Sequence, residues 1–379
     1  MTFTVSHPLI AASGQVTLGR ALAGSVAVTL PSLSPYAGVA DISLRGHAVV
    51  NTKFLRQAGR TSISTQGTIS VTGGMASAVA LIGDHATFNL TGGLHGRDIA
   101  VDKFEINGSM LHAAAAGGEK NGVVDFGWKA RLVNLSNLAS ATAGTIAAHG
   151  HVHGPLNDLS ATAHATAQVT TAGLPQETLT ASLQAHGIPS APSGQLDAQG
   201  RLAGAPLVLA AEVSRQSDGT LNFLLNRLQW KSASGSGALR LAPGTTVPLG
   251  HMQFRMAHLD EIAPLTGLKV AGSVNATLAT LQVQGKPEAR VRADIRHLTF
   301  DGDSVDRLGI DARVANPVTH PVVTAAMRVN GIRRGAFTGD ARLTANGPLG
   351  SLRLDASSNL QTPHGPATLS ATATAALSE

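Results

Sequence analysis

Residues 290–296 read Arg-Val-Arg-Ala-Asp-Ile-Arg, a run in which apolar and charged side chains alternate without a break. Successive side chains of a β-strand point to opposite faces, so Val291, Ala293 and Ile295 would share one face and the charges the other. Such one-sidedness favours an antiparallel strand with one solvated face over a parallel strand covered by helices on both faces. The run therefore predicts a half-buried antiparallel sheet.

The same period of two recurs along the chain. We predict that the apolar members of these runs line a common hydrophobic groove. With Val291 and Ile295, they are Val124, Phe126, Trp128, Met252, Phe254, Met256, Val323, Met327 and Val329. Glycine-containing turn signals lie between the runs, as at Gly117-Gly118, Asp301-Gly302 and Asn330-Gly331. This order of runs and turns predicts a meander of hairpins and an all-β fold.

Helical periodicity is nearly absent, and the only helix type that we expect is a single turn, such as residues 259–263, stopped by Pro264. Similar segments at 33–37 and 135–139 also precede a glycine that opens a strand. Repetition of one supersecondary unit is typical of quasi-linear architectures. We therefore interpret residues 1–379 as one continuous repetitive β-domain with approximate repeat units 1–120, 121–240 and 241–379.

The composition of the 379 residues excludes several classes of protein. Hydrophobic residues make up 43% and charged residues only 13%, which argues against a disordered chain. The lack of cysteine excludes disulfides, thiolate metal sites and thiol nucleophiles. No apolar run is long enough for a transmembrane helix. A net charge of +5 with 3% aromatic residues argues against nucleic-acid binding.

A sheet with one apolar face and almost no helices to cover it must curl on itself. The sequence is compatible with three curled architectures, which are a solenoid, a sandwich and an elongated trough with facing walls. We expect an elongated, repetitive antiparallel sheet curled into a taco-like trough or solenoid with an apolar interior and few short helical turns. In a closed solenoid that interior is core, whereas in an open trough it is an apolar groove that requires an occupant.

Candidate chemical sites are few. His149, His151 and His153 share one face of an expected strand and could bind Zn²⁺, but alignment of the repeats places that face outward. Gly302-Asp303-Ser304 resembles an esterase nucleophile block, yet it directly follows a turn dipeptide and has no downstream triad partners. Phosphate-binding and metalloprotease motifs are missing. We therefore expect no enzymatic activity, catalytic residue, metal or cofactor.

The segment Leu259–Leu268, followed by Ala271-Gly272-Ser273-Val274, resembles the interior of the TamB family, which belongs to the AsmA-like bridge proteins of Gram-negative bacteria. The likeness continues through Phe300-Asp301-Gly302 and residues 345–350. The resemblance implies a taco-like β-structure with an apolar channel that crosses the periplasm. It also implies a link to phospholipid transport between the inner and outer membranes and to the assembly of outer-membrane β-barrel proteins.

Two further expectations follow from that resemblance. The partners would be phospholipids and the outer-membrane barrel protein TamA, and the protein would be periplasmic as part of an inner-membrane-anchored protein. The family also has an N-terminal anchor and a C-terminal partner-binding domain, neither of which we recognise here, so we expect an internal segment. The alternative function is that of a surface adhesin or passenger-like β-solenoid with a filled interior.

Overall fold

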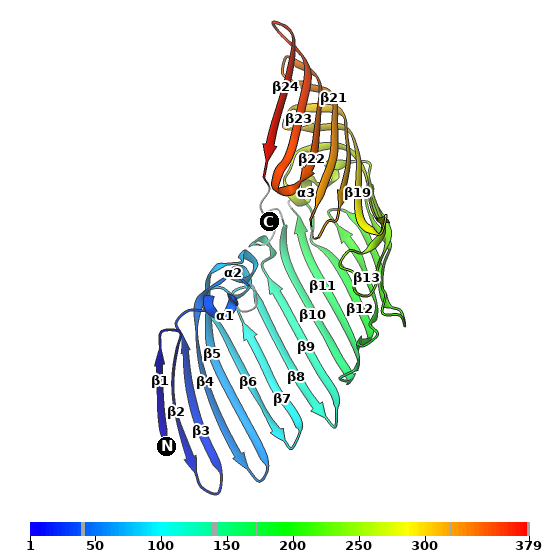
Figure 1. Cartoon of the computed structure of the whole chain (residues 1–379). Coiled ribbons are helices and arrows are strands. Elements are labelled where there is room, and N and C mark those ends of the chain that lie inside the picture. Colours follow the sequence, from blue (N-terminus) through cyan, green and yellow to red (C-terminus); the bar gives the residue numbers. More distant parts are fainter. Residues whose placement is uncertain (39–41, 138–141, 172, 319, 377–379) are drawn as a thin grey trace. The chain divides into compact units, whose positions relative to one another are not determined.

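The computed structural model describes residues 1–379 except 39–41, 138–141, 172, 319 and 377–379 (Figure 1). Strands account for 74% of it and helices for 7%. The chain divides into two compact units, Met1–Ser190 and Ala191–Glu379. Strand pairing within both units is antiparallel, which confirms the predicted all-β fold class with few short helical turns. No helix among the described residues is long and apolar enough to cross a membrane.

The N-terminal unit contains twelve strands that pair in sequence order (Figure 1). The strands are β1 (Thr2–His7), β2 (Ile10–Leu18), β3 (Leu22–Leu30), β4 (Leu44–Gln57), β5 (Arg60–Gly74), β6 (Ala86–His95), β7 (Asp98–Asn107), β8 (Leu111–Lys120), β9 (Val123–Val133), β10 (Thr142–Pro155), β11 (Asp158–Thr171) and β12 (Glu177–Pro189). Among the described residues β1 and β12 do not pair with each other, so the sheet of this unit is open.

Connections at the two ends of these strands differ. At one end the hairpins are tight, and Ala58-Gly59 and Asn121-Gly122 both have two successive positive φ angles, as a type I′ turn requires. At the other end the connections carry helical segments, namely α1 (Ser34–Gly38), α2 (Ala76–Ile82) and the 3₁₀ turn η1 (Leu135–Asn137). The helical segments therefore gather along one rim of the sheet (Figure 1).

The C-terminal unit contains a second antiparallel meander of twelve strands. The strands are β13 (Ser193–Leu202), β14 (Ala205–Arg215), β15 (Leu221–Trp230), β16 (Ala233–Leu241), β17 (Leu249–Met256), β18 (Val270–Val283), β19 (Lys286–Phe300), β20 (Asp303–Ala315), β21 (Val322–Arg334), β22 (Phe337–Pro348), β23 (Leu352–Thr362) and β24 (Gly365–Ala375). Its helical segments are η2 (Leu259–Ile262), α3 (Ala263–Thr266) and η3 (Leu349–Ser351).

Some predicted turns lie elsewhere. Asp301-Gly302 joins β19 to β20, as predicted, with φ of 50° and 87°. Gly117-Gly118 and Asn330-Gly331 instead lie inside β8 and β21 at shifts of strand register. A β-bulge needs an unusual backbone conformation in mid-strand, and glycine supplies it. The glycines at these positions therefore bend strands and do not connect them.

Helical turns occur near the three positions where the sequence repeats, at α1, η1 and η2. Residues 138–139 of the middle copy lie outside the described residues. Pro264 does not end the helical segment as expected, because it occupies the first turn of α3, where no backbone N–H is needed. The segment ends at Gly267, which has a left-handed conformation. The division into two compact units does not test the three-unit repeat, which stays a prediction.

Candidate functional site: the apolar faces of the two sheets

The register gives each sheet two chemically distinct faces, since directly paired residues of antiparallel strands project to the same side. One transverse row crosses the whole N-terminal unit and contains only apolar residues and glycine. From β1 to β12 it comprises Val5, Ala12, Val28, Val50, Gly67, Phe88, Ile106, Ala113, Ala130, Ala148, Ala165 and Ala181. We call the side that carries this row the apolar face of the unit.

The adjacent row has the opposite character. It comprises Thr4, Ser13, Ala27, Asn51, Gln66, Asn89, Glu105, Ala114, Lys129, His149, His164 and Ser182, and it defines the polar face. A one-residue shift in the pairing of any strand would move its apolar side chains to the polar face and its polar side chains to the apolar face. The pattern of side chains therefore specifies the observed register.

The C-terminal unit has the same organisation. One row runs through Ala198, Leu209, Leu228, Gly235, Phe254, Ala276, Ala293, Ile310, Met327, Leu343, Ala356 and Ala371. A hollow of about 250 Å³ lies on this face at its C-terminal end, where Met327, Val329 and Leu369 contribute to the lining. Most of the residues that line the hollow are apolar, with Arg342, Ser357 and Ser358 as the polar ones.

The register places the eleven predicted groove residues on these two apolar faces. Val124, Phe126 and Trp128 lie on the face of the N-terminal unit. The other eight, which are Met252, Phe254, Met256, Val291, Ile295, Val323, Met327 and Val329, lie on the face of the C-terminal unit. Met256 differs from the rest because only 3% of it is exposed, so it packs inside the protein and offers no surface to a ligand.

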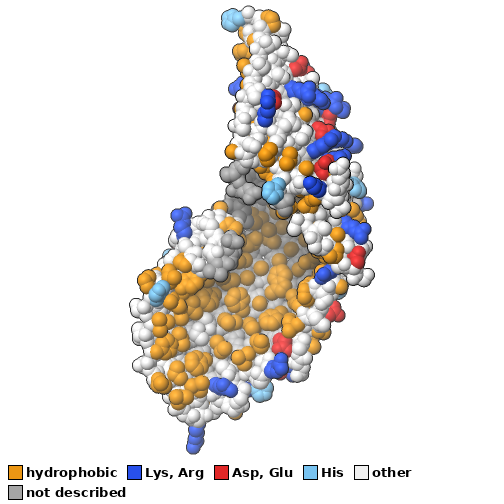
Figure 2. Space-filling view, viewed as in Figure 1, with side chains coloured by type: hydrophobic (Ala, Val, Ile, Leu, Met, Phe, Trp, Pro, Cys, Tyr) orange, Lys and Arg blue, Asp and Glu red, His pale blue; other side chains and the backbone are white. Residues whose placement is uncertain are grey.

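Within the residues that the structure describes, no second layer of protein covers most of either face. Val291 is 39% exposed and Leu369 66%, although both point to the apolar side. Within the N-terminal unit, Figure 2 shows hydrophobic side chains spread over a hollowed face from β3 to β11.

Aromatic rings lie over glycines of neighbouring strands on this face, an arrangement that sequence reasoning missed. A Cβ built on Gly24 would lie 2.5 Å from Phe54 Cζ, and one built on Gly67 would lie 2.6 Å from Phe88 Cε1. Trp128 approaches Gly150 in the same way, at 2.7 Å. Each ring lies over a glycine, which has no side chain of its own. The aromatic side chains therefore project little above the sheet, and the apolar face stays smooth.

One rim of the apolar face is closed by α2. Under it lie Ala86, which is fully buried, Met110, which is 1% exposed, and Val71, which is 4% exposed. The backbone N–H of Met110 donates to the carbonyl of Leu81 in α2 at 3.1 Å. Sequence analysis did not predict this helix, although the apolar run 75–82 followed by Gly83 is a usable helix signal.

The polar faces carry the titratable groups. On the N-terminal unit His151 Nε2 lies 2.7 Å from Asp125 Oδ1, and this hydrogen bond lowers the pKa of Asp125. The three histidines of β10 that the sequence offered as metal ligands, His149, His151 and His153, project to the polar face. They are paired with Lys129, Gly127 and Asp125 of β9. No group of three or more His, Asp or Glu side chains among the described residues is placed to hold a metal ion.

On the C-terminal unit the polar face carries a network of ion pairs. Asp294 lies 2.6 Å from Arg296 and 2.5 Å from Arg307, and the hydrogen bond from Arg296 lowers its pKa, with Arg307 adding to the effect. Asp303 and Asp306 pair with Arg334 and Arg333. Asp303 and Asp306, which follow the 301–302 turn, are thus each paired with an arginine.

The described residues thus offer two partly exposed apolar faces as the main candidate surface. Comparison of the chain with protein-family models and with curated proteins gives no match.

Proposed function

We propose that the apolar faces bind the acyl chains of phospholipids and shield them from water, without catalysis. The observation that carries this proposal is the unbroken apolar row that crosses all twelve strands of each unit with little protein over it. Exposed apolar patches beyond a few hundred Å² mark sites of interaction on proteins. Acyl chains match such a surface because they need contact and no directional hydrogen bonds.

The energetics fit an acyl occupant. Each buried methylene contributes about 0.8 kcal/mol, so a chain of about 16 carbons gains roughly 13 kcal/mol on leaving water. A smooth face lined by aliphatic side chains provides contact along the whole chain and little to hold it at one point. Such a surface favours movement of a lipid along it over tight storage at a single site.

The resemblance of residues 259–268 and 271–274 to the TamB family suggests where in the cell this lipid binding takes place. We propose that the protein is a periplasmic segment of an AsmA-like bridge that carries phospholipids between the inner and outer membranes. The same apolar face also suits unfolded strands of outer-membrane barrel proteins, and TamA is the partner that the resemblance suggests. A surface adhesin would need an interior filled by its own side chains, which the exposure of Val291 and Leu369 does not favour.

Mass spectrometry of lipids bound to the purified protein tests the proposal. The wild-type chain should carry phospholipid, and the double variant Phe126→Asp and Val291→Asp should lose about 90% or more of it. The reason is that an acyl chain cannot solvate a carboxylate. Met327→Asp should act like Val291→Asp. These positions are half-exposed, so the added charge should leave the fold intact, as circular dichroism would check.

The matched control introduces the same charges on the polar faces. Thr166 in β11 and Thr324 in β21 are exposed and project away from the apolar rows. The double variant Thr166→Asp and Thr324→Asp should keep its lipid. Equal lipid in both double variants, or wild-type protein free of lipid after expression in a Gram-negative host, would rule out the proposed function.

A further inference from the structure

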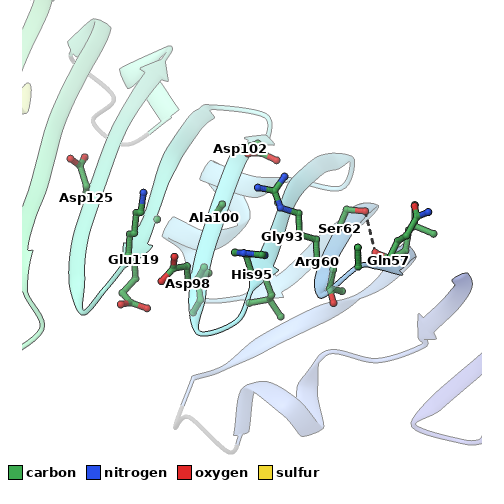
Figure 3. A pocket seen from close by; sticks show the side chains of 18 of the residues that line it. Gln57, Arg60, Ser62, Gly93, His95, Asp98, Ala100, Asp102, Glu119 and Asp125 are labelled. Atoms are coloured by element: carbon green, nitrogen blue, oxygen red, sulfur yellow. Dashed lines mark hydrogen bonds between the residues drawn. The ribbon is translucent and has the colours of Figure 1, made fainter. Parts of the chain in front are cut away.

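A separate cavity lies on the polar face of the N-terminal unit, beside the tight hairpin ends of β4 to β9 (Figure 3). Its volume is about 710 Å³, within the range of small-molecule sites. Most of its lining, such as Ser62 and Ala100, alternates with the apolar-face residues of the same strands, so the cavity opens on the polar side.

The backbone explains why a cavity forms here. Ser62, Gly93, Ala100 and Gly118 follow one another across β5 to β8, so the row that would fill the space has almost no side chains. Register shifts on both sides of β7 place Asp102 in a bulge directly beside this row. A bulge bends its strand and increases the local twist. Small side chains and a bent strand together hollow the surface.

The charges that line the cavity are segregated by strand. The β4–β6 side carries Arg60 and His95, which are direct cross-strand neighbours. The β7–β9 side carries Asp98, Asp102 and Asp125, with Lys120 as its only cation among the described lining residues. Glu119 also lines the cavity, but it pairs with Val124 and so projects toward the apolar side of the sheet. Figure 3 shows Asp98, Glu119 and Asp125 to one side of His95, and Arg60, Ser62 and Gln57 to the other.

The opposing charges do not neutralise each other. No ion pair joins Arg60 to an acidic residue in the part of the chain that the structure describes. Asp98 accepts a hydrogen bond only from the backbone N–H of Asn121, at 3.2 Å, among its described contacts. The backbones of Arg60 in β5 and Asp98 in β7 stand two strand spacings, or about 10 Å, apart. His95 of β6 lies between them and is directly paired with both. Apolar surface from Leu55, Ala100 and Val123 contributes to the lining between and beside them.

We infer that this cavity binds a small dipolar ligand, with an anionic group at Arg60, an ammonium group at Asp98, and a short apolar spacer between them. Both ends then form charge-assisted hydrogen bonds, which are stronger than neutral ones. The spacer packs on Ala100, whose small side chain leaves room for it. The ligand therefore differs in class from the acyl chains proposed for the other face.

A series of ω-amino acids tests the charge spacing by isothermal titration calorimetry on the full chain. We expect 6-aminohexanoate or 8-aminooctanoate to bind best, because their charged ends match about two strand spacings. 4-Aminobutanoate, octanoate and octylamine should each bind about tenfold more weakly, since each leaves one charged end of the cavity unused. Octanoate or octylamine binding as tightly as 8-aminooctanoate would overturn the inference.

Variants place the binding at this cavity. Arg60→Glu and Ala100→Phe should each weaken the best ω-amino acid about tenfold or more, the first by reversing a charge and the second by filling the hollow. The matched control is Arg131→Glu, which makes the same exchange on the polar face of β9 outside the cavity. Val28→Asp, on the apolar face, should leave this affinity unchanged, so the lipid proposal and this inference fail independently. Equal affinities in Arg60→Glu, Ala100→Phe and Arg131→Glu would overturn the assignment.

Discussion

The indole of Trp128 covers Gly150 on the neighbouring strand of the apolar face: a Cβ built on Gly150 would lie 2.7 Å from Trp128 Cε2 and Cζ2 and 2.4 Å from the Thr162 carbonyl oxygen. The two residues are directly paired between β9 and β10. The glycine therefore sets the position of the largest side chain on this face, and the indole takes the place of the missing side chain.

Gly150→Ala should destabilise the N-terminal unit by about 1–3 kcal/mol, because the added methyl group forces the indole and the β11 backbone apart. Urea unfolding in a Trp230→Phe background measures this, since Trp128 is then the only tryptophan. Gly127→Ala is the matched control. A Cβ there would find its nearest neighbour, the Ala116 carbonyl oxygen, at 4.0 Å, and it would lie on the polar face. Equal stabilities of the two variants would contradict the pairing.

The fold class could be predicted from the sequence because strand stereochemistry fixes a period of two. Val291, Ala293 and Ile295 alternate with charges, so their sharing of one face needs no knowledge of the neighbouring strands. The same argument applies to Phe126 and Trp128. Local chemistry also predicted the Asp301-Gly302 turn, since both residues adopt positive φ readily.

The aromatic–glycine contacts and the cavity could not be predicted from the sequence. Both depend on the strand register, which brings together residues far apart in the chain. Trp128 and Gly150 are 22 positions apart, and no spacing rule connects them before β9 is aligned with β10. The cavity beside Ala100 arises from a bulge at Asp102, whose position follows from packing of three strands. Met256 likewise has the pattern of a groove residue, yet it is buried.

Trp128 should report lipid on the apolar face. In a Trp230→Phe variant, phospholipids with brominated acyl chains should quench most of the fluorescence, because bromine quenches indole on contact. In a Trp128→Phe variant the remaining Trp230 should be quenched little. It is 7% exposed and its Nε1 donates to the Leu202 carbonyl at 2.7 Å, so a bound chain cannot reach it. Similar quenching in both variants would argue against binding at the Trp128 face.

Ser232→Ala should loosen the helical turn η2 from the C-terminal sheet. The Ser232 hydroxyl donates to Glu261 Oε2 at 2.5 Å and accepts from the His258 backbone N–H at 3.0 Å. Loss of these contacts should cost about 1–2 kcal/mol, and amide exchange at residues 259–262 should speed up. Ser234→Ala, at an exposed position two residues later, is the control and should change neither quantity. Unchanged exchange in Ser232→Ala would show that the Ser232 hydroxyl does not hold η2 in place.

Asp294→Asn should destabilise the C-terminal unit in a pH-dependent way. Arg296 and Arg307 are directly paired across β19 and β20, and Asp294 bonds to both. Without the carboxylate the two guanidinium groups face each other, and the expected loss near neutral pH is about 1 kcal/mol for this partly exposed cluster. The pKa of Asp294 lies below its ordinary value of 3.8 in the folded protein. Its contribution to stability is therefore complete above that value and disappears as the pH falls through the folded-state pKa.

Urea unfolding followed by Trp230 in a Trp128→Phe background measures this pH dependence. The difference in unfolding free energy between the protein that keeps Asp294 and the Asp294→Asn variant should be largest at about pH 6. It should shrink as the pH falls below the ordinary pKa of 3.8. Asp260→Asn, which changes an exposed carboxyl on η2, should show a smaller gap at every pH. A gap for Asp294→Asn that persists unchanged in acid would mean that shape, and not charge, holds these arginines.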